Sequence, residues 1–199
     1  MAQEICDNLD PRIRRTRQLL QQALGKLLET KDFEKISVQD IAEAATLNRA
    51  TFYDHYADKF ALLECVVASR FHELLTERNV QFDGTCAWAL RAMALAVCEF
   101  LTQIQGPDFT RQLDPHTESA IISVVRKMLL EGLKLHPSES ATAPEMIAAT
   151  TSWAMYGAVK EWTQTPDRSV SEEIANTVMT LVSPILQLAQ EEHPAQSLA

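Results

Sequence analysis

The sequence lacks the patterns that mark several protein classes. Its four cysteines form neither a CxxC pair nor a metal-ligand spacing, which favours reduced thiols used as small buried groups: Cys6, Cys65, Cys86 and Cys98. No HExxH, paired ExxH or nucleophile elbow surrounds the five histidines. We therefore expect no enzyme, no metal site and no cofactor.

Long apolar runs are also missing from the sequence. No stretch approaches the roughly 20 residues that a membrane span requires, and the acidic start MAQEICDNLD has no signal-peptide core. These absences predict a cytoplasmic protein. With 199 residues, 46% of them hydrophobic, the chain can bury a sizeable core as one domain or as a small and a larger one.

Positive charge is scarce, because the formal net charge is -9. Such a balance argues at first sight against a nucleic-acid partner. The charge is unevenly distributed, however: residues 1–60 carry 9 Lys and Arg against 10 Asp and Glu, whereas residues 61–199 carry 9 against 17. The first part of the chain is therefore nearly neutral and can still face DNA.

A first helix is expected to begin at Asp10-Pro11, where Asp10 can cap the free amides and Pro11 lacks only an N–H that would be unpaired anyway. Four arginines crowd its first turn and a half: Arg12, Arg14, Arg15 and Arg17. Because cations at a helix N-terminus oppose the macrodipole, the cluster indicates either an anionic partner or a solvated basic surface.

Residues 37–59 predict a helix, a tight turn and a second short helix. Ser37 and Asp40 have the spacing of a capping box, residues 45–47 break the helix that follows, and Asn48 can cap the next one. Asp58 then caps a longer fourth helix. This arrangement matches the helix-turn-helix geometry in which the second helix enters the major groove of DNA.

The second short helix presents two different faces. Phe52 and Tyr56, four residues apart, share the face expected to be buried, and Thr51 and His55 share another. Tyr53 lies beside the second pair and could belong to the core or to a contact surface. The polar face is the candidate DNA reader.

The run IAEAATLNRATFYDHYADKFALL resembles the N-terminal DNA-binding domain of the TetR family of bacterial transcriptional regulators. The resemblance is close over about residues 10–65, and the remainder fits the family in length and helical texture. It implies an all-α fold with an N-terminal three-helix DNA-binding domain (1–57) and a helical ligand-binding and dimerisation domain (58–199).

The resemblance, together with the arginine cluster, implies a set of DNA contacts. The base contacts would concentrate at Asn48 and Arg49, since an arginine can bind a guanine edge bidentately, and the others would donate to phosphates or base edges. The candidate DNA-binding residues are Arg15, Ser37, Gln39, Asn48, Arg49, Thr51, Tyr53, His55 and Lys59.

Two positions depart from the family pattern. Thr46 stands in the turn where Gly is common, and Gly is favoured there because the turn tends to need a backbone conformation that costs a residue with a Cβ about 1 kcal/mol or more. Ala50 stands where Gly or Ser is frequent, close to the DNA backbone. Both are interpreted as tolerated substitutions.

Beyond residue 80 the periodicity predicts four more helices, near 85–105, 117–136, 145–163 and 171–191, and residues 108–116 are expected to be irregular or one short turn. The helix at 117–136 is apolar on more than one face and is expected to be central to the bundle. Pro184 within the last helix predicts a kink or a freed carbonyl, and its role is open.

Ligand contacts in the second domain are proposed from apolar bulk and placed polar groups, although each candidate could equally be a core aromatic or a surface cation. They are Trp88, Arg91, Phe100, Arg126, Trp153 and Tyr156. A dimer interface is implied by the resemblance and agrees with a stripe of small and heptad-spaced apolar residues, which could also fold back on its own chain. That stripe comprises Ala154, Gly157, Ala158, Ile174, Val178, Leu181 and Ile185.

These observations predict a dimeric, ligand-responsive transcriptional repressor. It would bind a palindromic operator as a homodimer and be released when a small molecule binds the C-terminal helices. The fourth helix would link the two parts, because it begins at Lys59 and ends in the bundle. The alternative is a helix-turn-helix protein that binds DNA or a partner without an effector.

Overall fold

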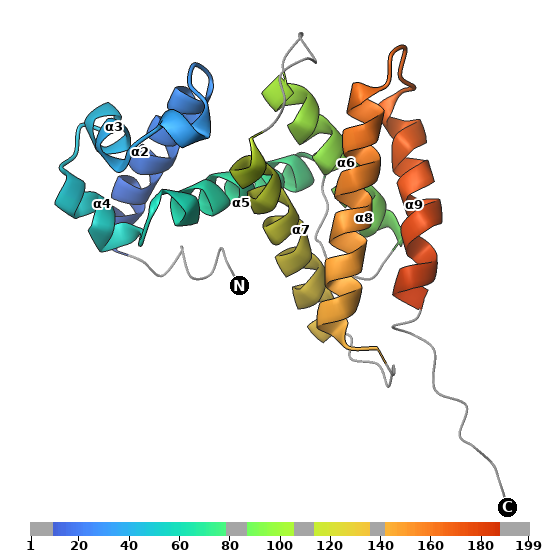
Figure 1. Ribbon diagram of the computed structural model, residues 1–199. Coiled ribbons are helices and arrows are strands. Elements are labelled where there is room, and N and C mark those ends of the chain that lie inside the picture. The colour runs from blue at the N-terminus through green and yellow to red at the C-terminus, as the bar shows by residue number, and fades with distance from the viewer. Residues whose placement is uncertain (1–9, 79–86, 106–113, 136–141, 188–199) are drawn as a thin grey trace, which may run out of the picture. The chain divides into compact units, whose positions relative to one another are not determined.

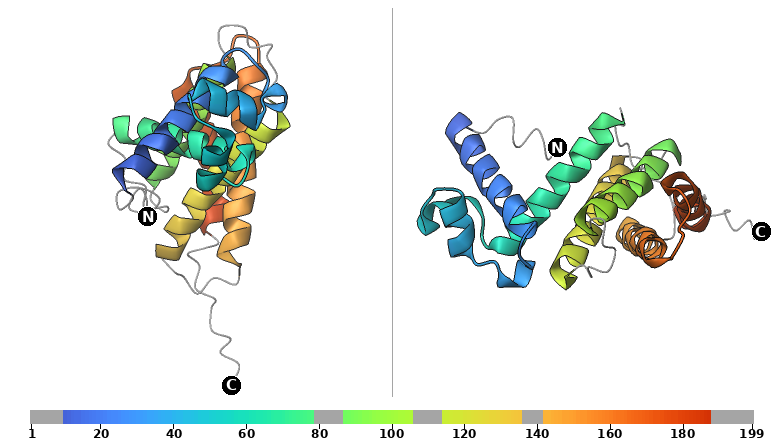
Figure 2. Two further views of the ribbon diagram at one scale, coloured as in Figure 1. Left: turned by 90° about the vertical axis from the view of Figure 1, so that its left-hand side faces the viewer. Right: turned by 90° about the horizontal axis from the view of Figure 1, so that it is seen from above.

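The computed structural model describes residues 10–78, 87–105, 114–135 and 142–187, and every regular element in this part of the chain is helical (Figure 1 and Figure 2). The predicted all-α fold is confirmed. The elements are α2 (Pro11–Leu28), the 3-10 turn η1 (Phe33–Lys35), α3 (Val38–Ala44), α4 (Arg49–His55), α5 (Lys59–Glu77), α6 (Ala87–Gln105), α7 (Pro115–Leu135), α8 (Pro144–Gln164) and α9 (Ser171–Gln187).

The chain forms two compact units. The first comprises Met1–Ser69 and Asp114–Ala120, and the second comprises Arg70–Leu113 and Ile121–Ala199. Because the division falls inside α5 and inside α7, both helices begin in the first unit and end in the second. The domain boundary predicted from the sequence, between residues 57 and 58, falls just before α5 begins and stays a prediction.

The first unit is built around the face of α4 that the sequence assigned to the core. Phe52 is completely buried and Tyr56 is 4% exposed, which confirms that assignment. α3 packs against both α2 and α4, and α2 also contacts α4. Leu20 and Leu24 of α2 and Ile41 of α3 complete this core, with no exposed surface.

The second unit is organised around α6. This helix packs against both α8 and α9, which also pack on each other. The central place expected for the 117–136 helix is therefore taken by α6. In α7, Ile121, Val125 and Leu129 are buried, whereas Arg126 and Lys127 are exposed.

The start of α7 differs from the prediction. The helix begins at Pro115 rather than Thr117, because Asp114 accepts hydrogen bonds from the amides of His116 (3.1 Å) and Thr117 (3.0 Å). The first turn belongs to the first unit, where the His116 ring lies 4.8 Å from that of Phe60 and 5.8 Å from that of Phe33. An Asp-Pro pair therefore starts α7 as it starts α2.

α6 also corrects the expectation that no apolar run approaches the length of a membrane span. By length and composition alone, Ala87–Ile104 could cross a membrane, with a mean hydropathy of 1.3 over 18 residues. In the structure 56% of that window is buried, since α6 packs between its neighbours. The core helix of a soluble helical bundle passes the same test.

The thiols and connecting segments are described in part. Cys98 is buried, and burial raises its pKa to about 12, as expected for an inert core thiol. Cys65 is half-buried. Cys6 and Cys86, the break expected near 80–84, the segment 108–113 and the predicted end of the last helix near residue 191 lie outside the described residues.

Candidate nucleic-acid interface

The turn between α3 and α4 contains one strained residue. Thr46 has a φ of 58°, in the left-handed region, and the following amide of Leu47 donates to the Ala42 carbonyl at 2.8 Å. The Thr46 amide donates to the Glu43 carbonyl at 2.9 Å. The prediction that this position favours Gly is therefore confirmed, because a residue with a Cβ rarely adopts this φ.

The start of α4 is held by two of the predicted DNA contacts. Asn48 Oδ1 accepts from the Thr51 amide at 2.7 Å and from the Thr51 hydroxyl at 3.0 Å. Asn48 is thus the predicted N-cap, and both polar groups bond to each other. These hydrogen bonds fix the residue at which α4 begins, and therefore the directions in which its side chains point.

The exposed face of α4 carries Arg49, Tyr53 and His55. Arg49 Nη2 donates to the Tyr53 hydroxyl at 3.1 Å, and its Cζ lies 5.5 Å from the centre of the Tyr53 ring. Tyr53 is 46% exposed, so it lies on the surface of the first unit rather than in the core, and its contact with DNA stays a prediction. His55 is half-buried at the end of the helix.

The start of α3 is held by a capping box of its own. The amide of Ser37 donates to Asp40 at 2.8 Å and the Asp40 amide donates to Ser37 Oγ at 3.1 Å, which confirms the capping box. Hydrogen bonds from Ser37 and Lys31 lower the pKa of Asp40 to about 2. Gln39, also predicted to face DNA, is exposed and donates to Glu43 at 2.6 Å.

Lys59, predicted to donate to DNA, donates instead to the chain's own backbone. Its ammonium donates to three backbone carbonyls, those of Phe33 (3.0 Å), Glu34 (3.2 Å) and Ile36 (2.8 Å), and lies 4.5 Å from the centre of the Phe33 ring. An ammonium has three donors, so all are committed. Lys59 therefore clamps α5 to the η1 turn, a role that no local sequence pattern indicates.

The arginine cluster divides into an inner and an outer part. Arg17 Nε donates to the Tyr56 hydroxyl at 3.3 Å, and this hydrogen bond raises the pKa of Arg17. Gln21 donates to the same hydroxyl at 3.1 Å, while burial raises the pKa of Tyr56. Arg17 thus ties α2 to the end of α4. The exposed arginines on α2 are Arg12, Arg14 and Arg15.

Part of this unit matches a known protein family in sequence. Residues 20–66, which include α3, the strained turn and α4, match the family model described as "Bacterial regulatory proteins, tetR family". The segment that contains the helix-turn-helix therefore belongs to the TetR family. The relatives described next are named as transcriptional regulators.

Three relatives illustrate the extent of the match. An uncharacterised HTH-type regulator, YxbF of Bacillus subtilis, is 28% identical over 168 residues, covering 70% of this chain and 44% of that protein. EthR of Mycolicibacterium smegmatis is 39% identical over 59 residues, covering 30% and 25%. The activator DhaS of Lactococcus lactis is 28% identical over 64 residues, covering 32% and 34%. The chain thus spans less than half the length of these relatives.

Solved structures of TetR regulators resemble this chain in fold. A TetR regulator from Rhodococcus matches with a TM-score of 0.57 at 12% identity, covering 89% of this chain and 99% of that one. One from Streptococcus agalactiae matches with a TM-score of 0.53 at 21% identity, covering 86% and 95%. At these identities the likeness concerns the fold alone.

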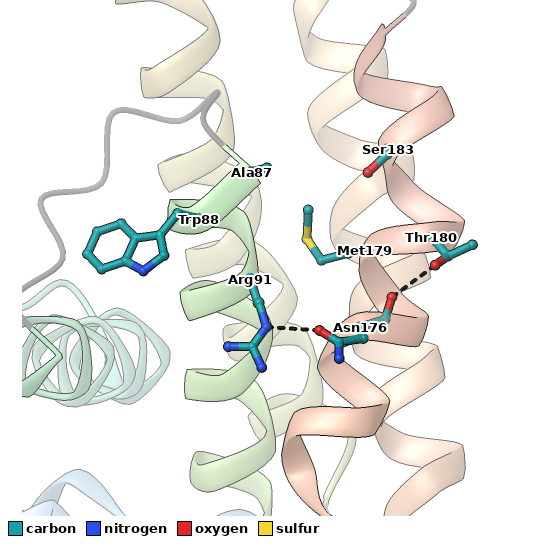
Figure 3. Close-up of a pocket in the computed structure, with 7 residues that line it drawn as sticks. All are labelled: Ala87, Trp88, Arg91, Asn176, Met179, Thr180 and Ser183. Atoms are coloured by element: carbon teal, nitrogen blue, oxygen red, sulfur yellow. Dashed lines mark hydrogen bonds between the residues drawn. The ribbon is translucent and has the colours of Figure 1, made fainter.

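The predicted ligand residues are not gathered in one place. Trp88 and Arg91 line an open groove of about 430 Å³ between α6 and α9, where Arg91 Nε donates to Asn176 Oδ1 at 2.9 Å (Figure 3). Arg91 and Asn176 point toward each other across it, whereas the Trp88 indole extends away from α9. Phe100 and Tyr156 are core residues, 6% and 3% exposed. Arg126 and Trp153 lie on the surface.

The predicted dimer stripe divides in the same way. Val178 is completely buried within its own chain and is therefore a core residue rather than a partner contact. Leu181 is 55% exposed and Gly157 is also exposed, with open space beside it. The half-buried members of the stripe are Ala154, Ala158, Ile174 and Ile185. Six of the seven positions thus keep accessible surface on α8 and α9.

Among the described residues no group of three or more His, Cys, Asp or Glu side chains is placed to hold a metal ion. The exposed polar groups of the first unit include the face of α4 that carries Arg49 and Tyr53 and the exposed arginines of α2.

Proposed function

We propose that this TetR-family chain is a DNA-binding transcriptional regulator that reads a near-palindromic operator as a homodimer. The observation that carries the proposal is the exposed Arg49–Tyr53 pair on α4, which follows a turn whose geometry belongs to a helix-turn-helix. Arginine is the side chain best suited to a guanine edge. The regulator would act in the cytoplasm, where bacterial DNA is located.

Selection of bound fragments from the genome of origin tests DNA reading. We expect the chain to enrich one palindromic site whose half-sites lie about 34 to 36 Å apart, one turn of DNA. Binding is then measured by fluorescence anisotropy at several salt concentrations, with Arg49→Ala as the variant and Arg126→Ala, an exposed cation on α7, as the matched control. Enrichment of no sequence by the unaltered chain would refute the proposal.

The dimer is supported by the apolar surface left on α8 and α9. Trp153 is 64% exposed and Leu181 is 55% exposed, and small residues near Trp153 allow a second helix to approach closely. A two-fold arrangement would present two copies of α4 to a palindrome. Sedimentation of the purified chain tests this, and a monomer at micromolar concentration would contradict it.

A small molecule is proposed to control binding through the second unit. The groove that Arg91 and Asn176 share offers cationic and amide groups next to the side chain of Met179, a combination that suits a small anionic ligand with an apolar part. Adding candidate compounds to the DNA complex tests the control, with Arg91→Gln as the variant. If DNA is bound and no compound releases it, the effector-independent alternative applies.

The sign of regulation is proposed to be repression, by occupation of the operator. A reporter gene placed behind the selected site tests this directly: expression should rise when the regulator is deleted. The relative DhaS is named an activator, so a fall in expression on deletion would assign the same sign to this chain.

A further inference from the structure

We propose that Tyr53 is a specificity-determining residue that positions Arg49, so that the two side chains read one base pair as a unit. This inference rests on the proposed DNA-reading function and goes further by assigning Tyr53 a role beyond contact with the DNA backbone. The two residues are four apart on α4 and therefore lie on one face of the helix.

The geometry of the pair restrains an exposed arginine. The Tyr53 hydroxyl accepts from Arg49 Nη2 at 3.1 Å, and the guanidinium carbon lies 5.5 Å from the ring centre. Among the described residues this tyrosine is the partner recorded for Arg49, and no carboxylate pairs with it. The guanidinium is therefore oriented without being neutralised.

Tyr53 is itself fixed from below. Its ring meets that of Phe52 edge to face, with centroids 5.4 Å apart and planes at 83°. Phe52 has no exposed surface, so it is immobilised by the core of the first unit. A buried ring thus supports a half-exposed ring, which in turn holds a surface cation. Such a chain of contacts reduces the rotamer freedom that an exposed arginine would lose on binding.

The hydrogen-bond inventory leaves the pair able to bind DNA. A guanidinium has five N–H donors, and one is used by Tyr53, so four remain where a guanine edge needs two. The tyrosine hydroxyl accepts from Arg49 and still has its own hydrogen to donate to a phosphate. Tyr53 can therefore join a backbone contact, which sets register, to the side chain that reads the base.

The test measures discrimination at a single base pair. The chain first selects its site, and Arg49→Ala identifies the base pair whose replacement ceases to matter. Affinities for the selected base pair and its three alternatives are then compared for the unaltered chain, Tyr53→Phe, Arg49→Ala and the double variant, all at one salt concentration. Tyr53→Phe keeps the ring and its contact with Phe52, and thermal unfolding verifies that the fold is retained.

We expect Tyr53→Phe to lower discrimination at that base pair by about 3- to 10-fold, the effect of one lost hydrogen bond. In the Arg49→Ala background the same change should alter discrimination by less than about 2-fold, because there is no arginine left to position. Discrimination at the other base pairs should stay unchanged. Arg15→Ala, which removes an exposed cation on α2, is the control expected to weaken binding to all sequences alike.

Three outcomes would overturn the inference. If Tyr53→Phe weakens all sequences equally, in both backgrounds, the hydroxyl serves only a phosphate. If Arg49→Ala leaves sequence preference intact, the pair reads no base. If the unaltered chain selects no site, both the proposed function and the inference have failed. The first two outcomes, in contrast, overturn the inference while DNA binding is retained.

Discussion

Replacing Thr46 by Gly should stabilise the protein. Thr46 has a φ of 58°, and a residue with a Cβ in the left-handed region costs roughly 1–2 kcal/mol, with β-branched residues least tolerant. Gly removes that strain but gives back roughly 0.5–1 kcal/mol because it makes the unfolded chain more flexible. The exposed Thr46 side chain has no recorded hydrogen bond among the described residues, so its loss removes little else.

The expected gain is therefore about 0.5–1 kcal/mol in the free energy of unfolding. Urea unfolding followed by circular dichroism measures it, and an unchanged m-value would show that the gain concerns stability rather than the unfolded ensemble. For a chain of this size the melting temperature should rise by about 1–4 °C. Operator binding should be retained, since the backbone conformation of the turn does not change.

Two variants at the same position isolate the cause. Thr46→Ala keeps a Cβ and should remain within about 0.5 kcal/mol of the unaltered chain, while Thr46→Asn, which tolerates the left-handed region better, should lie between Ala and Gly. Equal stability of the Gly and Ala variants would refute the argument, because the strain would then not depend on the Cβ.

The remaining predictions concern a clamp, a cap and an interface. Lys59→Ala should lower the free energy of unfolding by about 1–3 kcal/mol, because three carbonyls lose a charged donor, and should leave the salt dependence of DNA binding nearly unchanged. Asp40→Asn should flatten the acid dependence of stability. The folded pKa of Asp40 is about 2, below the ordinary 3.8, so this carboxylate stabilises the fold above pH 3.8 and its contribution is lost as the pH falls toward 2. Leu181→Glu should convert the proposed dimer to monomers in sedimentation, because it places a charge on an exposed apolar position of α9.

Each of these has a matched comparison. Lys59→Met keeps most of the aliphatic length, so a variant as unstable as Lys59→Ala would locate the effect in the ammonium; full stability with a salt slope reduced by about one would return Lys59 to a phosphate role. Measuring the unfolding of the unaltered chain at the same pH values separates the effect of Asp40 from that of other carboxylates. If stability falls with pH in parallel for the two proteins, Asp40 does not contribute as predicted. Leu135→Glu, on the 68% exposed last residue of α7, should leave the proposed dimer intact.

The caps of the first unit could be predicted from sequence because their signals are local. Asp10-Pro11, the Ser37–Asp40 box and Asn48 each act within three residues, and the structure has all of them. The same signal stands at Asp114-Pro115, where the sequence interpretation overlooked it and began the helix at Thr117. The strained turn could also be predicted, because Thr46 stands at a position where a left-handed backbone conformation favours Gly.

Long-range contacts could not be predicted in this way. Lys59 bonds to carbonyls 23 to 26 residues earlier in the chain, and nothing near Lys59 marks the η1 turn as its partner. A heptad-like spacing placed Val178 at an interface, yet a helix of a bundle shows the same spacing when the stripe faces its own core. Phe100 and Tyr156 were likewise predicted to line a ligand site because they are large and aromatic, although both are buried in the second unit.

The hydrogen-bond pattern limits how much of the DNA affinity can come from charge. Of the nine Lys and Arg in residues 1–60, Arg17 and Lys59 are engaged inside the first unit, and Lys31 and Lys35 form ion pairs with Asp40 and Asp32 at 3.3 and 2.7 Å. The other exposed cations of residues 1–60 are Arg12, Arg14, Arg15, Lys26 and Arg49, of which Arg14 has an interaction of its own and Arg49 donates to Tyr53.

Since each phosphate contact releases about 0.9 counterion, five cations per chain allow a slope of at most about 4.5 in the dependence of log affinity on log salt concentration. The acidic remainder of the chain opposes this attraction at long range. Sequence-independent binding by the proposed regulator should therefore be modest, and recognition should depend on the few side chains that α4 presents. On that proposal the hydrogen bond from Arg49 to Tyr53 matters for affinity, because a DNA-binding protein with little electrostatic attraction gains most from side chains that are already arranged for one base pair.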